Sequence, residues 1–258
     1  MYTESKPKYL SSLVSTIWHS DSDVDPNEGY IVPPSLGSQL VIKIYSSAAE
    51  TVLSGPVTQQ KQYPFVEGAA YFGIEFVPNA GSVFNDFLLK ELQDSSFNVH
   101  QVLGIDLMTL AHQLHESKGW MEQRHLLEAA VCRNYPVNGR FQNPNVLLAM
   151  EMANSRYGNI AIRELAAYVG VSQRQLERLF LRHTGLSPKT FCTTLRIQHV
   201  LNLLRCKQQV SLAHLALRCG YSDQAHLANE FRQVMGTTIS AYLKSATYVE
   251  AKNYFEIQ

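Results

Sequence analysis

Signals of membrane insertion and of export are missing from the sequence. No apolar run in the 258 residues approaches the roughly 20 residues that a membrane-spanning helix needs. Residues 1–12 also lack the apolar core of a secretory signal peptide. We therefore expect no contact with a membrane and a cytoplasmic location.

Catalytic motifs are equally scarce. The chain contains no P-loop, no GxSxG and no HExxH, and no pair of acid and base side chains that can be placed in one pocket. The sequence therefore disfavours an enzyme, and we predict no catalytic residue and no cofactor.

Metal ligands do not occur at useful spacing. The four cysteines form no CxxC pair, which argues against a disulfide framework or a zinc site; they are Cys132, Cys192, Cys206 and Cys219. All fall on predicted helices or their ends, so we expect buried or half-buried thiols. His112 and His115 share one helix face, but no third ligand lies near them, and the strand-rich part offers only His19 and His100. We predict no metal site.

The chain also lacks net charge, but this average hides an asymmetry. Residues 1–140 contain nine Lys or Arg against fifteen Asp or Glu, a net charge of −6. Residues 141–258 contain thirteen against seven, a net charge of +6. Unless surface charge is scattered by chance, the difference indicates that the C-terminal half contacts a polyanion.

Strand patterns dominate the first hundred residues. Val14–His19, Leu40–Tyr45 and Ala69–Val77 are rich in β-branched and aromatic residues, alternate in part, and are separated by Gly- and Pro-containing turns. They predict a small sheet or barrel, and Phe84–Leu92 is expected to form a short helix.

Helical periodicity begins near Ile105 and continues to Arg133. Lys118-Gly119 interrupts it, so the pattern predicts two helices in a hairpin whose apolar stripe packs within the domain or forms a dimer face. The turn-rich stretch that follows is typical of a linker. The predicted organisation is α+β, with an N-terminal domain at 1–133, a linker at 134–145 and an all-α domain at 146–258.

A helix-turn-helix pattern occupies Asn159–Phe180. Apolar residues at helical spacing end at Gly170, which suits a left-handed helix terminus, and Ser172 can cap the next helix. The second helix buries Leu176 and Phe180 and leaves polar and basic residues outward. Alone, this pattern fits either a DNA-binding unit or an αα-hairpin of any helical protein.

The same pattern recurs about fifty residues later, at Val210–Gly236. Gly220 takes the place of Gly170, Ser222 or Asp223 takes the place of the cap, and the helix exits correspond. A long helix from Pro188 to about Cys206 joins the two copies. Two copies bridged by one helix are much more specific than a single helix-turn-helix.

Residues 145–244 resemble the DNA-binding domain of the AraC/XylS family of bacterial transcription regulators. The resemblance is carried by Arg196 and by the motifs Glu164-Leu-Ala166, Gly170-Val-Ser172, Leu176-Glu-Arg-Leu-Phe180, Gly185-Leu-Ser-Pro188, Gly220-Tyr-Ser-Asp223 and Gly236-Thr-Thr238. In that family, two helix-turn-helix units on a common connecting helix insert recognition helices into successive major-groove segments. The resemblance therefore implies a transcription regulator whose partner is double-stranded promoter DNA.

Carried over by position, the resemblance also implies which residues contact DNA. The side chains that face base edges or phosphates would be Gln173, Arg174, Glu177 and Arg178 in the first unit, and Gln224, Ala225, His226 and Asn229 in the second. Arg182, Lys189, Arg218 and Arg232 would contact phosphates, which fixes register without reading sequence. For any single one of these residues, a solvated surface side chain is the alternative.

Two departures from the family pattern lie in the second unit and after it. Asn229 stands where relatives usually carry a basic residue, and the acidic Glu230 follows it. We therefore expect weaker phosphate contact by the second unit and stronger sequence reading by the first. Ile239-Ser-Ala-Tyr242-Leu243 replaces a closing motif that usually contains Pro and Tyr-Arg, which should alter local packing or a backbone contact without changing the fold.

The N-terminal part is loosely similar to a sensor-like domain of unknown function that precedes AraC-type DNA-binding domains. The similarity is carried by Trp18, by the Gly73-Ile-Glu-Phe76 strand followed by Pro78 and Gly81, and by the helices after it. Many family members have a cupin-like barrel in this place. This similarity implies a small effector or a dimer contact there, and leaves RNA polymerase open as a further partner. Two other hypotheses remain: a protein–protein regulator that docks through the helical half, and a small-molecule-binding protein in which DNA binding is secondary.

Overall fold

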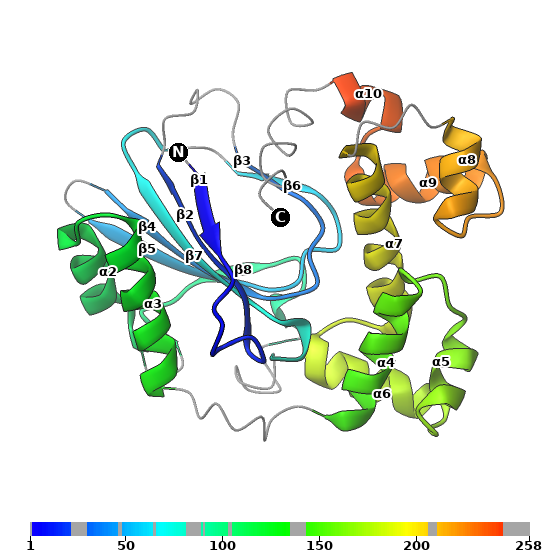
Figure 1. The fold of residues 1–258 in the computed structure, drawn as a ribbon, viewed down its shortest axis with the longest axis horizontal. Helices are drawn as coiled ribbons and strands as arrows, with labels where there is room; N and C mark the ends of the chain where they lie inside the picture. Colours follow the sequence, from blue (N-terminus) through cyan, green and yellow to red (C-terminus); the bar gives the residue numbers. More distant parts are fainter. Residues whose placement is uncertain are drawn as a thin grey trace.

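The computed structural model describes residues 2–21, 30–45, 48–63, 66–80, 89, 91–102, 105–134, 143–205 and 211–244. Figure 1 shows a sheet-containing N-terminal part beside an all-helical C-terminal part, with helix α7 (Pro188–Arg205) facing the sheet side. The α+β organisation predicted from the sequence is confirmed. No helix among the described residues has the length and apolar character to cross a membrane.

The strands of the main sheet pair antiparallel in the order β1-β2-β7-β4-β5-β8. Their bounds are β1 Tyr2–Ser5, β2 Val14–Asp21, β4 Gln39–Ile44, β5 Ala49–Ser54, β7 Ala70–Phe76 and β8 Ser96–Asn98. The three strands predicted from alternation are β2, β4 and β7, which include the centre of the sheet. Pairing among the described strands does not join β8 back to β1, so over these residues the sheet is open.

Two short ribbons complete the strand set. β3 Tyr30–Val32 pairs with β6 Lys61–Tyr63, and β9 Gln101–Val102 pairs with β10 Ile105–Asp106. The helix predicted at Phe84–Leu92 lies largely outside the described residues, of which 89, 91 and 92 are helical.

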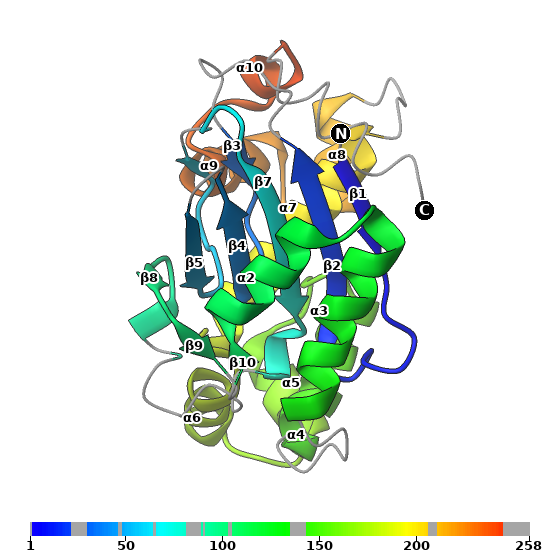
Figure 2. The same ribbon diagram turned by 90° about the vertical axis from the view of Figure 1, so that its left-hand side faces the viewer.

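Helices α2 (Leu107–Glu116) and α3 (Trp120–Asn134) cover one face of the main sheet, as Figure 2 shows. They are the predicted hairpin, broken at Lys118-Gly119. Side chains that alternate along β4 and β7, such as Ile42 and Phe72, point to this face and are buried with Leu110, Leu114 and Leu127. The core of the N-terminal part therefore lies between sheet and hairpin, which leaves the opposite sheet face toward the C-terminal part.

That opposite face carries a close ring-to-backbone contact. Trp18 on β2 is opposite Gly73 on β7, and a Cβ atom added at Gly73 would lie 2.0 Å from the indole. Trp18 is buried only because its partner lacks a side chain. The glycine within the β7 pattern thus marks a site of close packing.

Glu75 lies on the same face of β7, two residues beyond Gly73. Burial raises the pKa of its carboxyl to about 7; the Ser15 hydroxyl opposes this increase and the charge of Glu4 adds to it. The folded state therefore favours the neutral acid, whereas the unfolded chain ionises near the ordinary value of 4.5.

We expect Glu75→Gln to stabilise the protein at neutral and alkaline pH. A group whose pKa is raised by folding disfavours the folded state once the unfolded form ionises, so its cost should grow between pH 4.5 and about 7 and reach roughly 3 kcal/mol. Urea unfolding of parent and variant from pH 4 to 8 measures the difference. A difference that stays constant across this range would contradict the effect of burial on Glu75.

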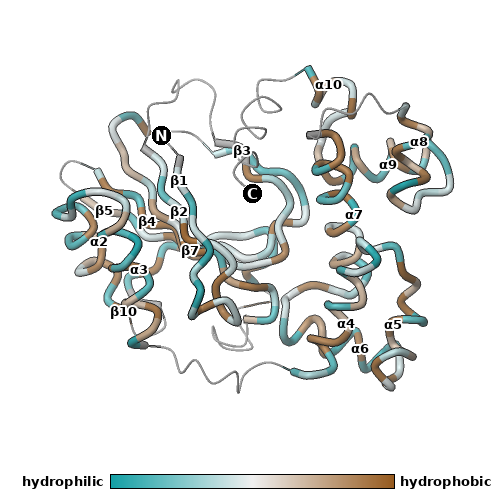
Figure 3. Tube along the Cα trace, viewed as in Figure 1, coloured by the Kyte–Doolittle hydropathy of each residue, from teal (hydrophilic) through white to brown (hydrophobic). Residues whose placement is uncertain are grey.

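The C-terminal part is built from helices around two cores. The remaining helices are α4 Pro144–Ser155, α5 Ile162–Tyr168, α6 Gln173–Thr184, α8 Leu212–Arg218, α9 Gln224–Met235 and α10 Ile239–Lys244. One core includes Phe180 and Phe191, and the other includes Phe231 and Tyr242. Apolar and polar stretches alternate along these helices in Figure 3, and α7 contributes residues to both cores.

The N-terminal part contacts both cores of the C-terminal part. Leu36, just before β4, is buried in the core of α4–α6. The Gln198 amide of α7 donates to the carbonyl of Pro34 at 3.0 Å, and the backbone N–H of Gln60 donates to the carbonyl of Val234 at 2.8 Å. The connecting helix and the end of α9 are thus both held by the sheet-containing part.

Candidate nucleic-acid interface

Helices α5 and α6 form the first helix-turn-helix as the sequence predicts. Gly170 lies in the turn with a φ of +72°, a conformation that glycine adopts without strain. The Ser172 hydroxyl accepts a hydrogen bond from the Gln175 backbone N–H at 3.2 Å and so caps α6. Leu165, Leu176 and other apolar residues of the pair are buried, which fixes the outward face of α6.

Helices α8 and α9 repeat this arrangement. Gly220 has a φ of +77°, and the N-cap of α9 is Asp223, whose carboxylate accepts from the His226 backbone N–H at 2.8 Å. This bond is the largest of the contacts that lower the pKa of Asp223. Of the two caps that the sequence allowed, the structure has Asp223. Gly185 and Gly236 end α6 and α9 in the same left-handed conformation, so the duplication extends to both helix ends.

Every residue predicted to contact DNA is exposed to solvent. On or beside the first unit these are Gln173, Arg174, Glu177, Arg178, Arg182 and Lys189; on the second they are Arg218, Gln224, Ala225, His226, Asn229 and Arg232. The structure therefore gathers the first group mainly along α6 and the second mainly along α9. Lys189 lies instead at the start of α7, and Arg218 at the end of α8.

The ring of His226 makes two contacts with neighbouring residues of the second unit. Its Nδ1 lies 3.2 Å from the Ser222 hydroxyl, and its ring meets the edge of Tyr221 with centroids 5.2 Å apart. These contacts orient the ring at the first turn of α9, while the side chain stays exposed.

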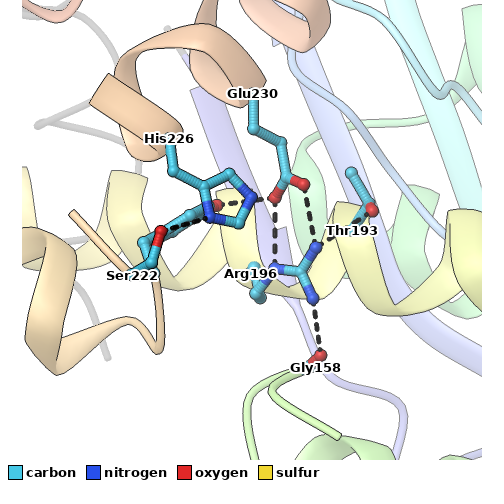
Figure 4. A network of polar contacts seen from close by, with 7 residues as sticks. Gly158, Thr193, Arg196, Ser222, His226 and Glu230 are labelled. Atoms are coloured by element: carbon cyan, nitrogen blue, oxygen red, sulfur yellow. Dashed lines mark hydrogen bonds and ion pairs between the residues drawn. The ribbon is translucent and has the colours of Figure 1, made fainter. Parts of the chain in front are cut away.

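A largely buried ion pair, with 20% of the Arg196 and 14% of the Glu230 side chain exposed, fixes the second unit to the connecting helix, as Figure 4 shows. Arg196 of α7 donates to both carboxylate oxygens of Glu230, from Nε at 3.1 Å and from Nη2 at 2.8 Å. Its Nη1 donates to the carbonyl of Gly158 at 3.0 Å, in the turn after α4. The Tyr221 hydroxyl donates to the same carboxylate at 2.8 Å. One guanidinium thus joins the turn between α4 and α5, α7 and α9.

The protonation states in this cluster follow from burial and charge. Burial alone would lower the pKa of Arg196, but hydrogen bonding to Glu230 and the charge of that carboxylate raise it above its usual value. Burial raises the pKa of the Tyr221 hydroxyl, and the Glu230 carboxylate raises it further. The tyrosine therefore stays a neutral donor and the arginine a cation.

Glu230, one of the two residues from which weaker phosphate contact by the second unit was predicted, is not a free surface acid. Its side chain is 14% exposed and is paired with Arg196, so α9 does not present this charge to a ligand. The two residues that contact Glu230, Arg196 and Tyr221, both lie in motifs that carry the family resemblance. The sequence pattern does not reveal the ion pair, because Arg196 and Glu230 lie thirty-four positions apart.

The cysteines correct one expectation and leave one untested. Cys192 and Cys219 are buried free thiols, and burial raises the pKa of each to about 11. Cys132 is exposed on α3, contrary to the prediction of a buried or half-buried thiol. Cys206 lies outside the described residues. In the described part of the chain, no three or more metal-ligating side chains gather into a metal site.

Comparison with known proteins agrees with this geometry. A helix-turn-helix domain family matches residues 165–245. An uncharacterized HTH-type transcriptional regulator of Haemophilus influenzae is 36% identical over 86 residues, which are 33% of this chain and 28% of that protein. The HTH-type transcriptional activator RhaS of Escherichia fergusonii is 35% identical over 72 residues, 28% of this chain and 26% of that protein.

A solved structure is similar in the same region. It is a transcriptional regulator with an AraC-type DNA-binding domain from Chromobacterium violaceum, 30% identical, with a TM-score of 0.34, covering 37% of this chain and 85% of that chain. The chain spans little more than a quarter of the length of either curated relative described above. The C-terminal part of this chain therefore contains a helix-turn-helix domain that is similar to those of AraC-type regulators.

Proposed function

We propose that this protein is a sequence-specific DNA-binding transcriptional regulator that reads two adjacent major-groove segments. The observation that carries the proposal is the duplicated helix-turn-helix, in which α6 and α9 each expose polar and basic side chains from the same positions. A connecting helix holds both units, so one chain addresses two segments about one DNA turn (~34 Å) apart without a two-fold axis.

The side chains of α6 suit base recognition. Arg174 and Arg178 are four residues apart on one exposed face and can each bind guanine O6 and N7. Glu177 can accept from the amino group of cytosine. On α9, Gln224 or Asn229 can bind adenine N6 and N7.

Cationic side chains on and around these helices are suited to contact phosphates. Arg182, Lys189, Arg218 and Arg232 are exposed and can fix the register of the protein on the duplex. Each neutralised phosphate should add about 0.9 to the slope of log affinity against log salt concentration. The +6 net charge of residues 141–258 supports this role.

In vitro site selection with the purified full chain tests the proposal. We expect an enriched site with two recognised segments about one helical turn apart. Binding to the selected site should weaken as salt rises. If no sequence is enriched, the helical half is a docking module for another protein, and the proposal fails.

We further propose that the N-terminal part modulates DNA binding by holding the spacing of the two recognition helices. Its contacts support this: Leu36 enters the core of the first unit, and Gln60 binds the carbonyl of Val234 at the end of α9. At the end of α6, a Cβ atom added at Gly185 would lie 2.6 Å from the carbonyl oxygen of Leu89. A change within the N-terminal part thus has a route to both helices. A small effector there, a second copy and RNA polymerase remain predicted partners.

Leu36→Ala tests this coupling. We expect it to destabilise the protein by about 2–5 kcal/mol, because the buried Leu36 side chain fills space between the two parts. Hydrogen exchange should show faster exchange in α4 and α6 as well as around β4. The control is Leu148→Ala on α4, where the side chain is 43% exposed and the cost should be small. If only amides of the N-terminal part respond to Leu36→Ala, the coupling is absent.

A further inference from the structure

A cavity of about 390 Å³ opens beneath the turn between α2 and α3. Its sheet side is formed by β1, β2, β4 and β7, including Ile44 and Phe72, and its helix side by Leu114 and Trp120. Figure 2 shows this turn above the ends of β1 and β2. None of the residues predicted to contact DNA lines it, so the cavity is separate from the nucleic-acid interface.

Three rings form a stack along one side of the cavity. The His19 ring lies nearly parallel to Phe72, with centroids 4.6 Å apart and an angle of 25° between the planes. Trp120 continues the stack on α3, with its centroid 6.1 Å from His19 and an angle of 18°. All three rings line the cavity, so an aromatic ligand can pack against their surface.

The polar groups of the lining are hydrogen-bonding side chains without a carboxylate, an ammonium or a guanidinium group. The described lining residues include no Asp, Glu, Lys or Arg; besides backbone groups, polarity comes from Thr3, His19, His115 and Gln123. A charged ligand would lose hydration there, and the lining holds no Asp, Glu, Lys or Arg to form an ion pair with it, so the lining selects against such a ligand.

Gln123 supplies a second, independent indication of a ligand. Gln123 lines the cavity, and its side-chain Oε1 is buried without a hydrogen-bond partner among the described residues, so a turn of the amide toward the cavity would bring this acceptor to a ligand. A buried acceptor without a partner costs free energy, which a ligand donor would recover. The missing partner is an O–H or N–H group.

We propose that this cavity binds an uncharged planar aromatic molecule that carries a hydroxyl or ring N–H, of the phenol or indole class. The ring stacks on the Phe72–His19–Trp120 side, and its donor binds Gln123 Oε1. The cavity lies within the range of volumes that small-molecule sites have. As an effector site the cavity rests on the proposed function, whereas ligand binding itself does not.

The site also has a structural route to the second part of the chain. Leu36, which packs into the C-terminal part, lies just before β4, and Ile44, which lines the cavity, is the last residue of that strand. A ligand that draws α3 toward the sheet therefore acts on a strand whose entry is anchored in the core of the first helix-turn-helix unit.

Titration of the full chain with phenol, toluene and benzoate tests the proposal by calorimetry. We expect phenol to bind about tenfold more tightly than toluene, because it adds one hydrogen bond to the same ring. Benzoate should not bind detectably. Phenol should also change tryptophan fluorescence in the parent, and this change should vanish in Trp120→Phe, because the other tryptophan, Trp18, packs on Gly73 of the opposite sheet face.

Two Gln→Leu variants distinguish a loss of ligand binding from a general effect on the fold. Gln123→Leu should reduce phenol affinity about tenfold and leave toluene affinity unchanged, whereas Gln113→Leu, on the exposed side of α2, should change neither. Equal affinities for phenol and toluene in the parent, or equal effects of the two variants, would overturn the proposal. If Gln123→Leu does not fold, the phenol–toluene comparison and Trp120→Phe decide alone. Because no DNA is present, failure here is distinct from failure of site selection.

Discussion

Arg174→Ala and Arg178→Ala should each weaken binding to a selected DNA site by roughly 1–3 kcal/mol, which raises Kd about 5- to 150-fold. Both side chains lie on the exposed face of α6, in a unit whose inward face is fixed by Leu176 and Phe180. An arginine that binds two guanine atoms cannot be replaced by water without loss of specificity. Each variant should therefore also relax the sequence preference at one base pair.

Fluorescence anisotropy with the selected duplex and with a scrambled duplex measures both effects. The matched control is Arg133→Ala, an exposed arginine at the end of α3 in the other part of the chain. It should leave affinity nearly unchanged. Lys189→Ala should weaken both duplexes alike and lower the salt slope by about one, as expected for a phosphate contact. If both α6 variants bind the selected site as well as the parent, α6 is not a base-reading helix.

The second recognition helix should contribute more than its sequence suggests. Because Glu230 is paired with Arg196, α9 does not present its negative charge, and Arg232 remains exposed beside Asn229. The first unit still has more cations on its outward face, in Arg174, Arg178 and Arg182. We therefore still expect α6 to contribute more to sequence recognition than α9, because α6 exposes more cationic side chains.

Local patterns made the C-terminal part predictable. Apolar spacing, a glycine in the turn and a capping side chain act within one helix pair, so Gly170, Ser172 and Gly220 could be placed from neighbours in sequence. The exposure of the candidate DNA contacts followed from the same periodicity. The N-terminal part was harder because β1 and β8 are short edge strands, whose formation depends on partners far along the chain.

Contacts between elements were the least predictable part. Leu36 looks like a loop residue, yet it completes the core of another domain. Glu230 looks like a surface acid, yet it is half of a buried ion pair. The cavity beneath the α2–α3 turn depends on Trp120 and His19 meeting across the sheet–helix layer. Such tertiary contacts leave no periodic pattern in the sequence, because they form only when complete helices and strands pack together.

Arg196→Met should destabilise the C-terminal part by about 3–5 kcal/mol. The substitution leaves the Glu230 carboxylate in a site where 14% of the side chain is exposed, without the cation that offsets its lost hydration. It also frees the carbonyl of Gly158, which accepts from Arg196 in the turn after α4. Hydrogen exchange should show α8 and α9 opening more readily than α5 and α6, because the link between α7 and α9 is lost.

The double variant Arg196→Met, Glu230→Leu decides whether the loss comes from the unpaired charge. Removing both ions should recover most of the stability, since an apolar pair of similar volume often replaces a buried ion pair without net cost. Urea unfolding of the parent, of Arg196→Met, of Glu230→Leu and of the double variant gives the coupling energy between Arg196 and Glu230. A double variant as unstable as Arg196→Met would assign the effect to packing instead. A recovered double variant that still binds DNA weakly would show that the ion pair serves mainly to fix the orientation of α9 relative to α6.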